Sequence, residues 1–119
     1  MIEFKQGNLL EADTEALVNT VNTEGVMGKG LALQFKKVFP EMFEEYKKAC
    51  KNGEVTIGKM NIFRLASLIC PKYIINFPTK INWRRSSHIN YIKDCLSDLE
   101  KVLKTLNIQS LAIPPLLMK

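Results

Sequence analysis

The stretch Val18 to Phe39, V-N-T-V-N-T-E-G-V-M-G-K-G-L-A-L-Q-F-K-K-V-F, decides the fold of this chain of 119 residues. It begins as an apolar, β-branched strand that ends in two asparagines. It continues through a glycine-rich turn and then takes up the spacing of an amphipathic helix. The N–H groups of such a turn and the N-terminus of the helix meet at one place, where they bind phosphate. The stretch therefore predicts a nucleotide-diphosphate site without a metal, with carboxamides beside it that can hydrogen-bond a sugar.

The composition indicates a single domain that covers residues 1–119. Apolar residues make up 46% of the chain, and no run approaches the roughly 18 apolar residues of a membrane span. The N-terminus lacks the long apolar core of a signal peptide, so we expect a cytoplasmic protein that has no membrane partner. The net charge of +5 favours an anionic partner, but its cations are more dispersed than in a dedicated DNA clamp.

The three cysteines, Cys50, Cys70 and Cys95, lie far apart in the sequence. They form no C-x-x-C motif and no cluster with the single histidine. We therefore expect no zinc site, no other metal and no cofactor. Reduced structural thiols are the expected state.

Strand-like and helix-like segments alternate along the chain. The expected strands are Ile2 to Lys5, Ala16 to Val21, Lys59 to Leu65, Tyr73 to Phe77 and Ser110 to Ile113. The expected helices run from after Gly30 to Phe39, from Pro40 to near Gly53, and from Ser86 or Ser87 to near Asn107. We expect Pro78 to end the fourth strand. The alternation predicts an α/β fold with a largely parallel sheet.

Three separated segments follow strands and should meet at one rim of that sheet. They are Asn19 to Gly30, Thr79-Lys80 and Pro114-Pro115. Open α/β sheets bind their ligands beyond the carboxyl ends of the strands. The rim is therefore the expected position of the site.

The glycine motif, Gly25-Val-Met-Gly28-Lys-Gly30, matches neither a Walker A loop nor G-x-G-x-x-G. Its N–H groups and the helix dipole can still hold a pyrophosphate, although a plain strand-to-helix connection is an equal alternative. Lys29 is interpreted as a charge at the rim of the site rather than as a catalyst.

Asn19 and Asn22 interrupt the apolar run before this motif. A buried carboxamide without a partner costs about 1–3 kcal/mol, so each must form a turn or bind a ligand. Asn22 is nearer to the glycines and is the better candidate for a ligand-binding residue.

Lys80 and the segment Trp83-Arg84-Arg85 are the other candidates at this rim. A lysine at the end of an apolar strand can act as a nucleophile, although an ordinary solvent-exposed lysine is the alternative. Trp83 beside two arginines offers a stacking plane for a nucleobase and cations for a phosphodiester. A tryptophan that packs on the domain from a surface loop is an equal alternative.

The residues Asn19 to Phe35, N-T-V-N-T-E-G-V-M-G-K-G-L-A-L-Q-F, resemble the macrodomain family, which binds ADP-ribose. The resemblance covers essentially the whole chain. It includes Q-G-N-L-L at Gln6 to Leu10, F-P-E at Phe39 to Glu41, N-F-P-T-K-I-N-W-R at Asn76 to Arg84, and L-A-I-P-P-L at Leu111 to Leu116. M-G-K-G-L-A-L-Q-F-K-K and the context of Lys80 resemble the branch of the DarG-type DNA ADP-ribosyl glycohydrolase antitoxins and the terminal ADP-ribose protein glycohydrolases.

The resemblance implies a three-layer α/β/α fold with a mixed, largely parallel sheet. It implies that Asn22 holds the distal ribose and that Lys80 is the catalytic lysine at the anomeric carbon. Asn8 stands where the family commonly has aspartate, and this departure is mild. The implied ligand-binding residues are Asn8 and Leu9 by the adenine, Val26, Met27, Gly28, Lys29, Gly30, Leu31 and Ala32 around the pyrophosphate, Trp83 and Arg84 beside the modified base, and also Asn19 and Thr79.

The implied reaction removes ADP-ribose from thymidine in single-stranded DNA and so reverses the action of a partner ADP-ribosyltransferase toxin. The implied partners are ADP-ribose, ADP-ribosylated single-stranded DNA and that toxin. After I-P-P-L the family continues with a second glycine-rich loop, a helix and a last strand, which this sequence lacks. We therefore keep two alternatives: a module that binds ADP-ribose without turnover, and a homo-oligomer that completes the sheet. A plain nucleic-acid binder is a third alternative.

Overall fold

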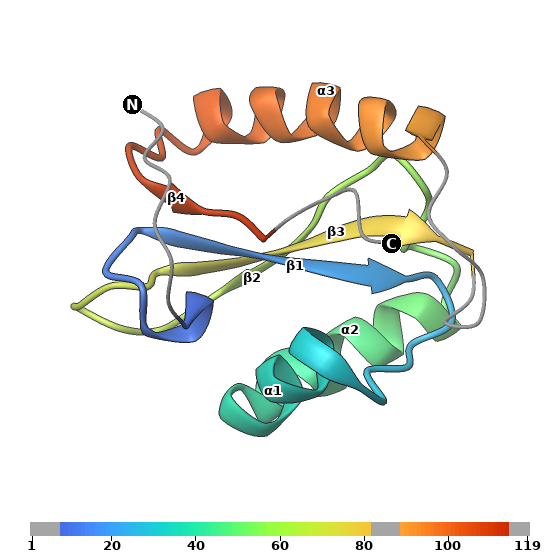
Figure 1. Cartoon of the computed structure of the whole chain (residues 1–119), viewed down its shortest axis with the longest axis horizontal. Helices are drawn as coiled ribbons and strands as arrows, with labels where there is room; N and C mark the ends of the chain where they lie inside the picture. The colour runs from blue at the N-terminus through green and yellow to red at the C-terminus, as the bar shows by residue number, and fades with distance from the viewer. Residues whose placement is uncertain (1–7, 82–88, 115–119) are drawn as a thin grey trace.

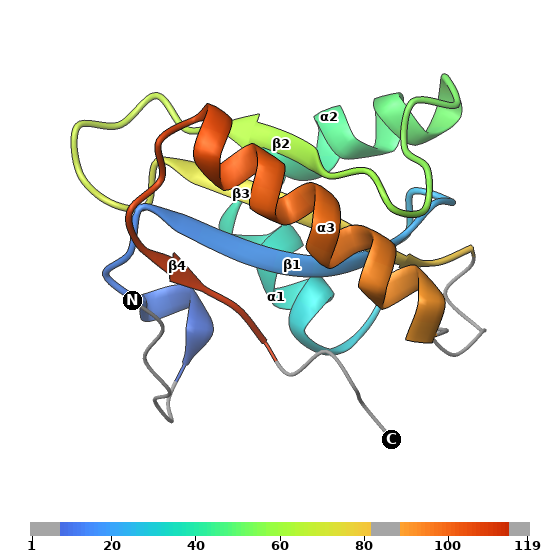
Figure 2. The same ribbon diagram turned by 90° about the horizontal axis from the view of Figure 1, so that it is seen from above.

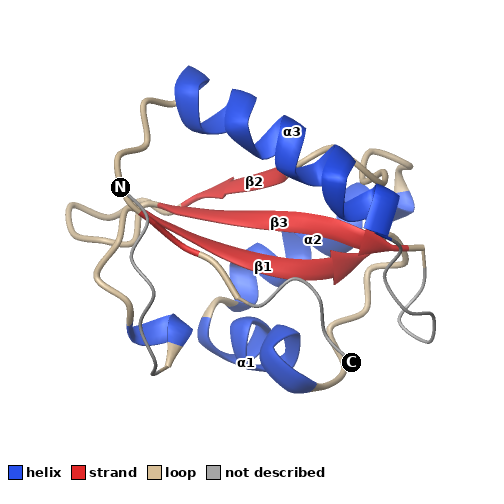
Figure 3. Ribbon diagram, turned by 45° about the horizontal axis from the view of Figure 1, so that its top comes forward, coloured by secondary structure: helices blue, strands red, loops and turns tan. Residues whose placement is uncertain are grey.

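The computed structural model of the chain describes residues 8–81 and 89–114, drawn in colour in Figure 1. The expected strand Ile2 to Lys5 and the expected helix cap at Ser86 or Ser87 lie outside these residues. Within the described part, one mixed sheet carries helices on both of its faces (Figures 1 and 3). The predicted three-layer α/β/α architecture is therefore confirmed.

The elements follow one another in nearly the predicted order. They are the 3-10 helix η1 (Leu9–Glu11), β1 (Ala16–Asn22), α1 (Gly30–Val38), α2 (Pro40–Lys51), β2 (Asn61–Arg64), β3 (Tyr73–Lys80), α3 (Ile89–Thr105) and β4 (Leu111–Ala112). None of the described helices is long and apolar enough to cross a bilayer.

The four described strands lie in the order β2-β3-β1-β4. The central strand β1 runs parallel to β3 and to β4, whereas β2 is antiparallel to β3. Figure 2 shows α3 lying over one face of this sheet, with α1 and α2 on the far side. The sheet is mixed and largely parallel, as the sequence predicts.

Strand β3 is longer than predicted. Pro78 does not end it, because the strand continues to Lys80. Pro78 pairs with Val21 of β1, and after a shift in register Lys80 pairs with the last residue of β1. The other neighbour, β2, pairs with β3 only as far as Asn76. Pro78 therefore lies beyond that ladder and interrupts no hydrogen bond on the β2 side.

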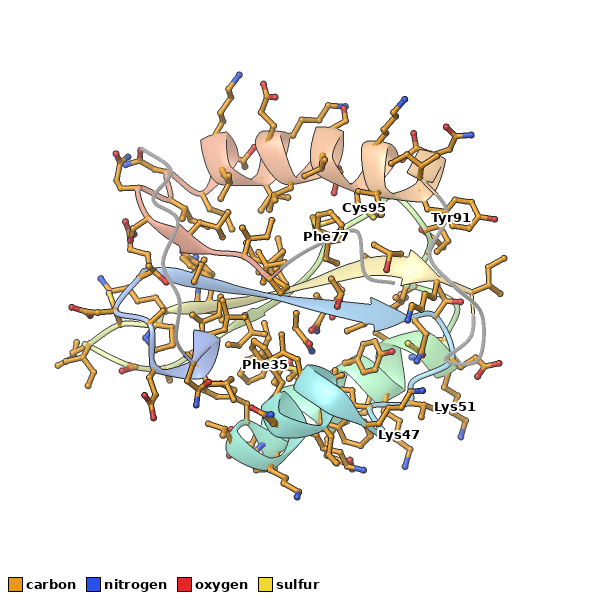
Figure 4. The ribbon with its side chains drawn as sticks, in the orientation of Figure 1. Phe35, Lys47, Lys51, Phe77, Tyr91 and Cys95 are labelled. Atoms are coloured by element: carbon orange, nitrogen blue, oxygen red, sulfur yellow. The ribbon has the colours of Figure 1, made fainter. Side chains whose placement is uncertain are left out.

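Alternate residues of β1 enter two separate cores. Leu17 and Val21 pack with Phe35 of α1 and with residues of α2 on one face, whereas Val18 packs with residues of β3 and α3 on the other. Figure 4 shows Phe35 below the sheet, and Phe77 with Cys95 above it. A strand buried on both faces has to be apolar at successive positions, which explains the apolar run Ala16-Leu17-Val18 at the start of β1.

Two local signals set helix boundaries where the sequence predicts. Pro40 is the first residue of α2, a position whose backbone angle suits proline. Asn107 follows α3 with a φ of 54°, the left-handed conformation that commonly terminates helices. Both boundaries depend on neighbouring residues alone, which makes them predictable.

Candidate functional site

The two predicted catalytic residues are brought together by the register of β1 and β3. Asn22 and Lys80 are paired positions on these parallel strands, at the carboxyl end of each. One residue further on, the Thr23 hydroxyl donates to the Ile81 carbonyl at 2.7 Å, and the Thr23 N–H donates to the same oxygen at 3.3 Å. Asn22 is 5% exposed, whereas Lys80 is partly buried. The third residue here, Thr79, is buried at the shift in register.

The carboxamide of Asn22 organises the glycine turn. Its Oδ1 accepts the backbone N–H groups of Glu24, Gly25 and Val26 at 3.0, 3.2 and 3.3 Å. Its Nδ2 donates to the Val26 carbonyl at 2.8 Å. Of the two interpretations of Asn22, the turn-forming one is therefore observed. One Nδ2 proton remains for a ligand, so a role at the ribose stays a prediction.

Helix α2 contributes a residue that sequence reasoning missed. The hydroxyl of Tyr46 lies 2.7 Å from the Asn22 carbonyl and 2.9 Å from Asn22 Oδ1. Burial raises the pKa of the Tyr46 hydroxyl, and Cys50 beside it adds to the rise. The phenol is therefore a neutral donor. The available signal was a tyrosine on the buried stripe of a helix, because a buried hydroxyl needs a partner.

The glycines of the turn differ in what the backbone requires of them. Gly25 and Gly30 have φ values of 88° and 62°, which favour glycine. Gly28 has no positive φ, and among the described residues a Cβ there would meet only Val26 Cγ1, at 3.5 Å. The fold itself therefore gives Gly28 no reason to be a glycine. A backbone that a ligand approaches closely gives one.

Helix α1 begins beside this turn without a side-chain cap. Its N-cap residue, Lys29, is extended and its side chain makes no capping hydrogen bond. The N–H groups of the first turn of a helix have no partner within the helix, and the helix dipole adds positive potential there. Lys29 is exposed, and Leu31 and Ala32 are partly buried. This arrangement can hold an anion such as a pyrophosphate.

Two of the predicted ligand-binding residues point into the core. Asn19 is 0% and Met27 is 1% exposed, and Asn19 Nδ2 lies 3.8 Å from Met27 Sδ. Asn19 also donates to Asn76 Oδ1 at 3.3 Å, and Asn76 donates to Asn61 Oδ1 at 3.0 Å. The three asparagines are paired positions on β1, β3 and β2. Their carboxamides support the sheet from within, and contact of Asn19 or Met27 with a ligand stays a prediction.

The structure does not bring the predicted adenine residues to the Asn22–Lys80 end. Asn8 caps η1 by accepting the Leu10 N–H at 3.0 Å, and Leu9 is the first residue of η1. Figure 1 shows η1 near the start of β1, whereas Asn22 ends that strand. A further two predicted residues, Trp83 and Arg84, lie outside the described residues.

In the described part of the chain, neither a metal cluster nor the hollow between α2 and β2 coincides with Asn22 and Lys80. Residues 8–81 and 89–114 contain no group of histidine, cysteine and acidic side chains that could hold a metal ion. A hollow of about 270 Å³ lies between α2 and β2. Tyr46 lines it, but Asn22 and Lys80 do not. The candidate site is therefore the rim formed by the ends of β1 and β3 and by the glycine turn.

This architecture and loop are those of a macrodomain. Residues 18–118 match the Macro domain family, and the chain belongs to that family, as the resemblance implies. It is 61% identical over 116 residues to the DNA ADP-ribosyl glycohydrolase of Mycobacterium tuberculosis (strain ATCC 25618 / H37Rv), a match that covers 98% of this chain and 33% of that protein. The enzyme of the same name from Thermus aquaticus is 52% identical, with 98% and 32% covered. The chain thus spans about a third of these relatives.

Solved structures agree with this assignment. The macrodomain of Mycobacterium tuberculosis DarG has a TM-score of 0.95 at 61% identity, covering 98% of this chain and 76% of that one. The macrodomain of Thermus aquaticus DarG has a TM-score of 0.96 at 50% identity, covering 100% and 79%. Thermosipho africanus DarTG, solved in complex with ADP-ribose, has a TM-score of 0.84 at 33% identity, covering 91% and 31%.

Proposed function

We propose that this chain is an ADP-ribose-binding macrodomain that releases ADP-ribose from a modified nucleobase, namely thymidine in single-stranded DNA. The observation that carries the proposal is the pairing of Asn22 with Lys80 beside an uncapped helix N-terminus. The names of the Mycobacterium and Thermus relatives support the reaction and DNA as its substrate. The Thermosipho complex supports the ligand.

In the proposed mechanism each part of the rim has one task. The N–H groups of residues 26–32 hold the pyrophosphate, and the remaining Nδ2 proton of Asn22 holds a hydroxyl of the distal ribose. The amine of Lys80 forms a bond to the anomeric carbon as the bond from that carbon to the base breaks. The proton that Lys80 loses goes to the departing base, and water then displaces Lys80 and yields free ADP-ribose.

The test is release of ADP-ribose from a modified thymidine oligonucleotide by the wild type and by Lys80→Ala. We expect the variant to lose at least about a hundredfold in rate, the lower range for a lost proton-transfer or nucleophilic group. Lys72→Ala is the matched control, because this exposed lysine lies just before the start of β3, at the opposite end of that strand. Equal rates for wild type and Lys80→Ala would remove Lys80 from the mechanism.

A binding module without turnover is the second candidate function. Its supporting observation is that the glycine turn and the uncapped start of α1, which would hold the anion, are built without Lys80. Calorimetry that detects saturable ADP-ribose binding, together with no release from any modified oligonucleotide, would favour this candidate over the hydrolase.

We further propose a cytoplasmic setting and an ADP-ribosyltransferase partner. The supporting relative is a DNA ADP-ribosyl transferase–DNA ADP-ribosyl glycohydrolase fusion protein of Thermosipho africanus, which is 32% identical over 130 residues. Co-purification of the chain with a DNA ADP-ribosyltransferase, undiminished by an excess of an unrelated macrodomain, would support the partnership, and displacement by that competitor would contradict it.

A further inference from the structure

We propose that Tyr46 is a positioning residue of this site, because its hydroxyl holds the Asn22 carboxamide in the orientation that the ligand meets. The inference rests on the function proposed above. It adds a residue of α2, a helix that contributes none of the predicted site residues.

The first argument is the geometry between α2 and the end of β1. Tyr46 Oη lies 2.7 Å from the main-chain oxygen and 2.9 Å from the side-chain oxygen of Asn22. Tyr46 is 1% exposed, and its ring packs against Phe43 with centroids 6.3 Å apart. Figure 4 labels the next residue, Lys47, and shows this turn of α2 beneath the arrowhead of β1. The ring is therefore anchored in the core while its hydroxyl reaches the rim.

The second argument is the identity of the atoms on Asn22. Three backbone N–H groups of the turn and the Tyr46 hydroxyl all approach the same atom, Oδ1. The three N–H groups can only donate, so the atom that they approach must be the oxygen, and Nδ2 is the atom turned toward Val26 and the remaining space. Asn22 can therefore offer a donor to a ribose hydroxyl. With the amide reversed it would offer an acceptor instead.

The third argument is the protonation state of the phenol. Burial raises the pKa of Tyr46, and the thiol of Cys50 adds to the rise. The hydroxyl consequently keeps its proton through neutral and mildly alkaline pH. Without it, the Asn22 side chain would keep the turn's N–H groups but lose its hydrogen bond to α2.

The primary experiment removes the hydroxyl and keeps the ring. We expect Tyr46→Phe to weaken ADP-ribose binding about tenfold, which is the loss of roughly one net hydrogen bond. Tyr73→Phe is the matched control, because it deletes the same atom at the other end of the sheet, where the hydrogen bond found for that hydroxyl among the described residues comes from exposed Arg64 at 3.1 Å. Calorimetry measures the Kd of ADP-ribose for both variants, and thermal unfolding checks that each variant is folded. An unchanged Kd for Tyr46→Phe would overturn the proposal.

A double-mutant cycle separates positioning from packing. If Tyr46 acts through Asn22, then Tyr46→Phe has no further effect on Kd in the Asn22→Ala background. A purely structural Tyr46 would give the same loss in both backgrounds, and that outcome contradicts the proposal. In turnover assays we expect Tyr46→Phe to raise KM and to leave kcat nearly unchanged, since the bound substrate and the transition state use the ribose contact alike.

A measurement on the wild type covers the case in which a variant does not fold. The buried hydroxyl proton of Tyr46 should exchange slowly enough to give an NMR signal, and this signal should shift when ADP-ribose binds. A signal that stays unmoved at saturation overturns the positioning role. Wild type that binds ADP-ribose without releasing it defeats the hydrolase proposal alone, because the Kd and NMR tests of Tyr46 remain valid. Wild type that binds none defeats both.

Discussion

At the scale of single residues, the backbone conformation explains one glycine of the turn, Gly25, but not another, Gly28. Gly25 has a φ of 88°, and a Cβ there would lie 3.4 Å from Cys50 Cβ. Gly28 has no positive φ, and a Cβ there would make an ordinary van der Waals contact with Val26 Cγ1 at 3.5 Å. The two glycines stand three positions apart, yet only Gly25 is required by the backbone.

We therefore expect opposite behaviour from two alanine variants. Gly25→Ala should lower the free energy of unfolding by about 1–2 kcal/mol, the cost of a left-handed L-residue. Gly28→Ala should keep that free energy within about 1 kcal/mol of wild type but weaken ADP-ribose binding, because in the proposed site its methyl group would face the pyrophosphate. Urea unfolding and calorimetry on both variants provide the comparison. Wild-type affinity in Gly28→Ala would contradict the assigned position of the ligand.

At the scale of elements, strand β3 is held from both layers. On the α2 side its Asn76 donates to Asn61 and to Met42 Sδ at 3.0 and 3.6 Å. On the α3 side the thiol of Cys95 donates to the Pro78 carbonyl at 2.9 Å. Pro78 stands two residues before Lys80, so the packing of α3 bears directly on the position of the predicted nucleophile.

Because Cys95 is buried, the free energy of unfolding should fall as the pH rises through the alkaline range. Burial raises the pKa of Cys95 to about 11, with the carboxylates of Asp94 and Asp98 adding to the rise. An unfolded thiol ionises near pH ~8.5, so above that pH the unfolded state loses its proton first. The contribution is complete below pH ~8.5 and declines by up to about 1.4 kcal/mol per pH unit until the pH nears 11.

The measurement is urea unfolding at several values between pH 7.5 and pH 10.5, roughly the range set by these two pKa values. We expect Cys95→Ser to show a flatter decline than wild type, because serine keeps a donor for the Pro78 carbonyl but does not titrate in this range. The difference between the two proteins removes the contributions of lysines and of Tyr46. Parallel declines would show that Cys95 is not the group responsible.

At the scale of the whole molecule, the structure shows where part of the net charge of +5 lies. Lys47 and Lys51 are exposed on α2, and Figure 4 shows both at the end of the molecule where β1 ends. Among the described residues the ion pair found is Lys104 with Glu100, at 3.1 Å on α3. Lys47 and Lys51 therefore remain available to the phosphates of a nucleic acid.

We expect the double variant Lys47→Gln/Lys51→Gln to bind an ADP-ribosylated oligonucleotide more weakly. The slope of log K against log salt should fall by about 0.7 for each phosphate that the variant no longer neutralises. Its binding of ADP-ribosylated thymidine alone should match wild type. Lys72→Gln/Lys101→Gln has the same change in charge away from that end and is the control. The same effect in both double variants would indicate a general charge effect and no defined DNA path.

Much of this fold was predictable because its signals are local. Pro40 starts α2 and Asn107 follows α3 where expected, since each boundary depends on the conformation of one residue. The end of β3 was not predictable from Pro78, because pairing with β1 decides where that strand stops.

By itself, the sequence determined the order of strands and helices, the glycine turn, the α/β class and the macrodomain family. The first three follow from periodicity and from motifs within about 20 residues of one another, which neighbouring residues specify. The family follows from the resemblance of those motifs to known macrodomains. Only the tertiary structure decided that Asn22 stands beside Lys80, that Asn19 is buried against Asn76, and that Tyr46 reaches Asn22. Each of these contacts joins different elements, 24 residues apart in the last case and 57 in the second. Strand register and helix packing set such contacts, and both depend on the assembled core rather than on any one segment.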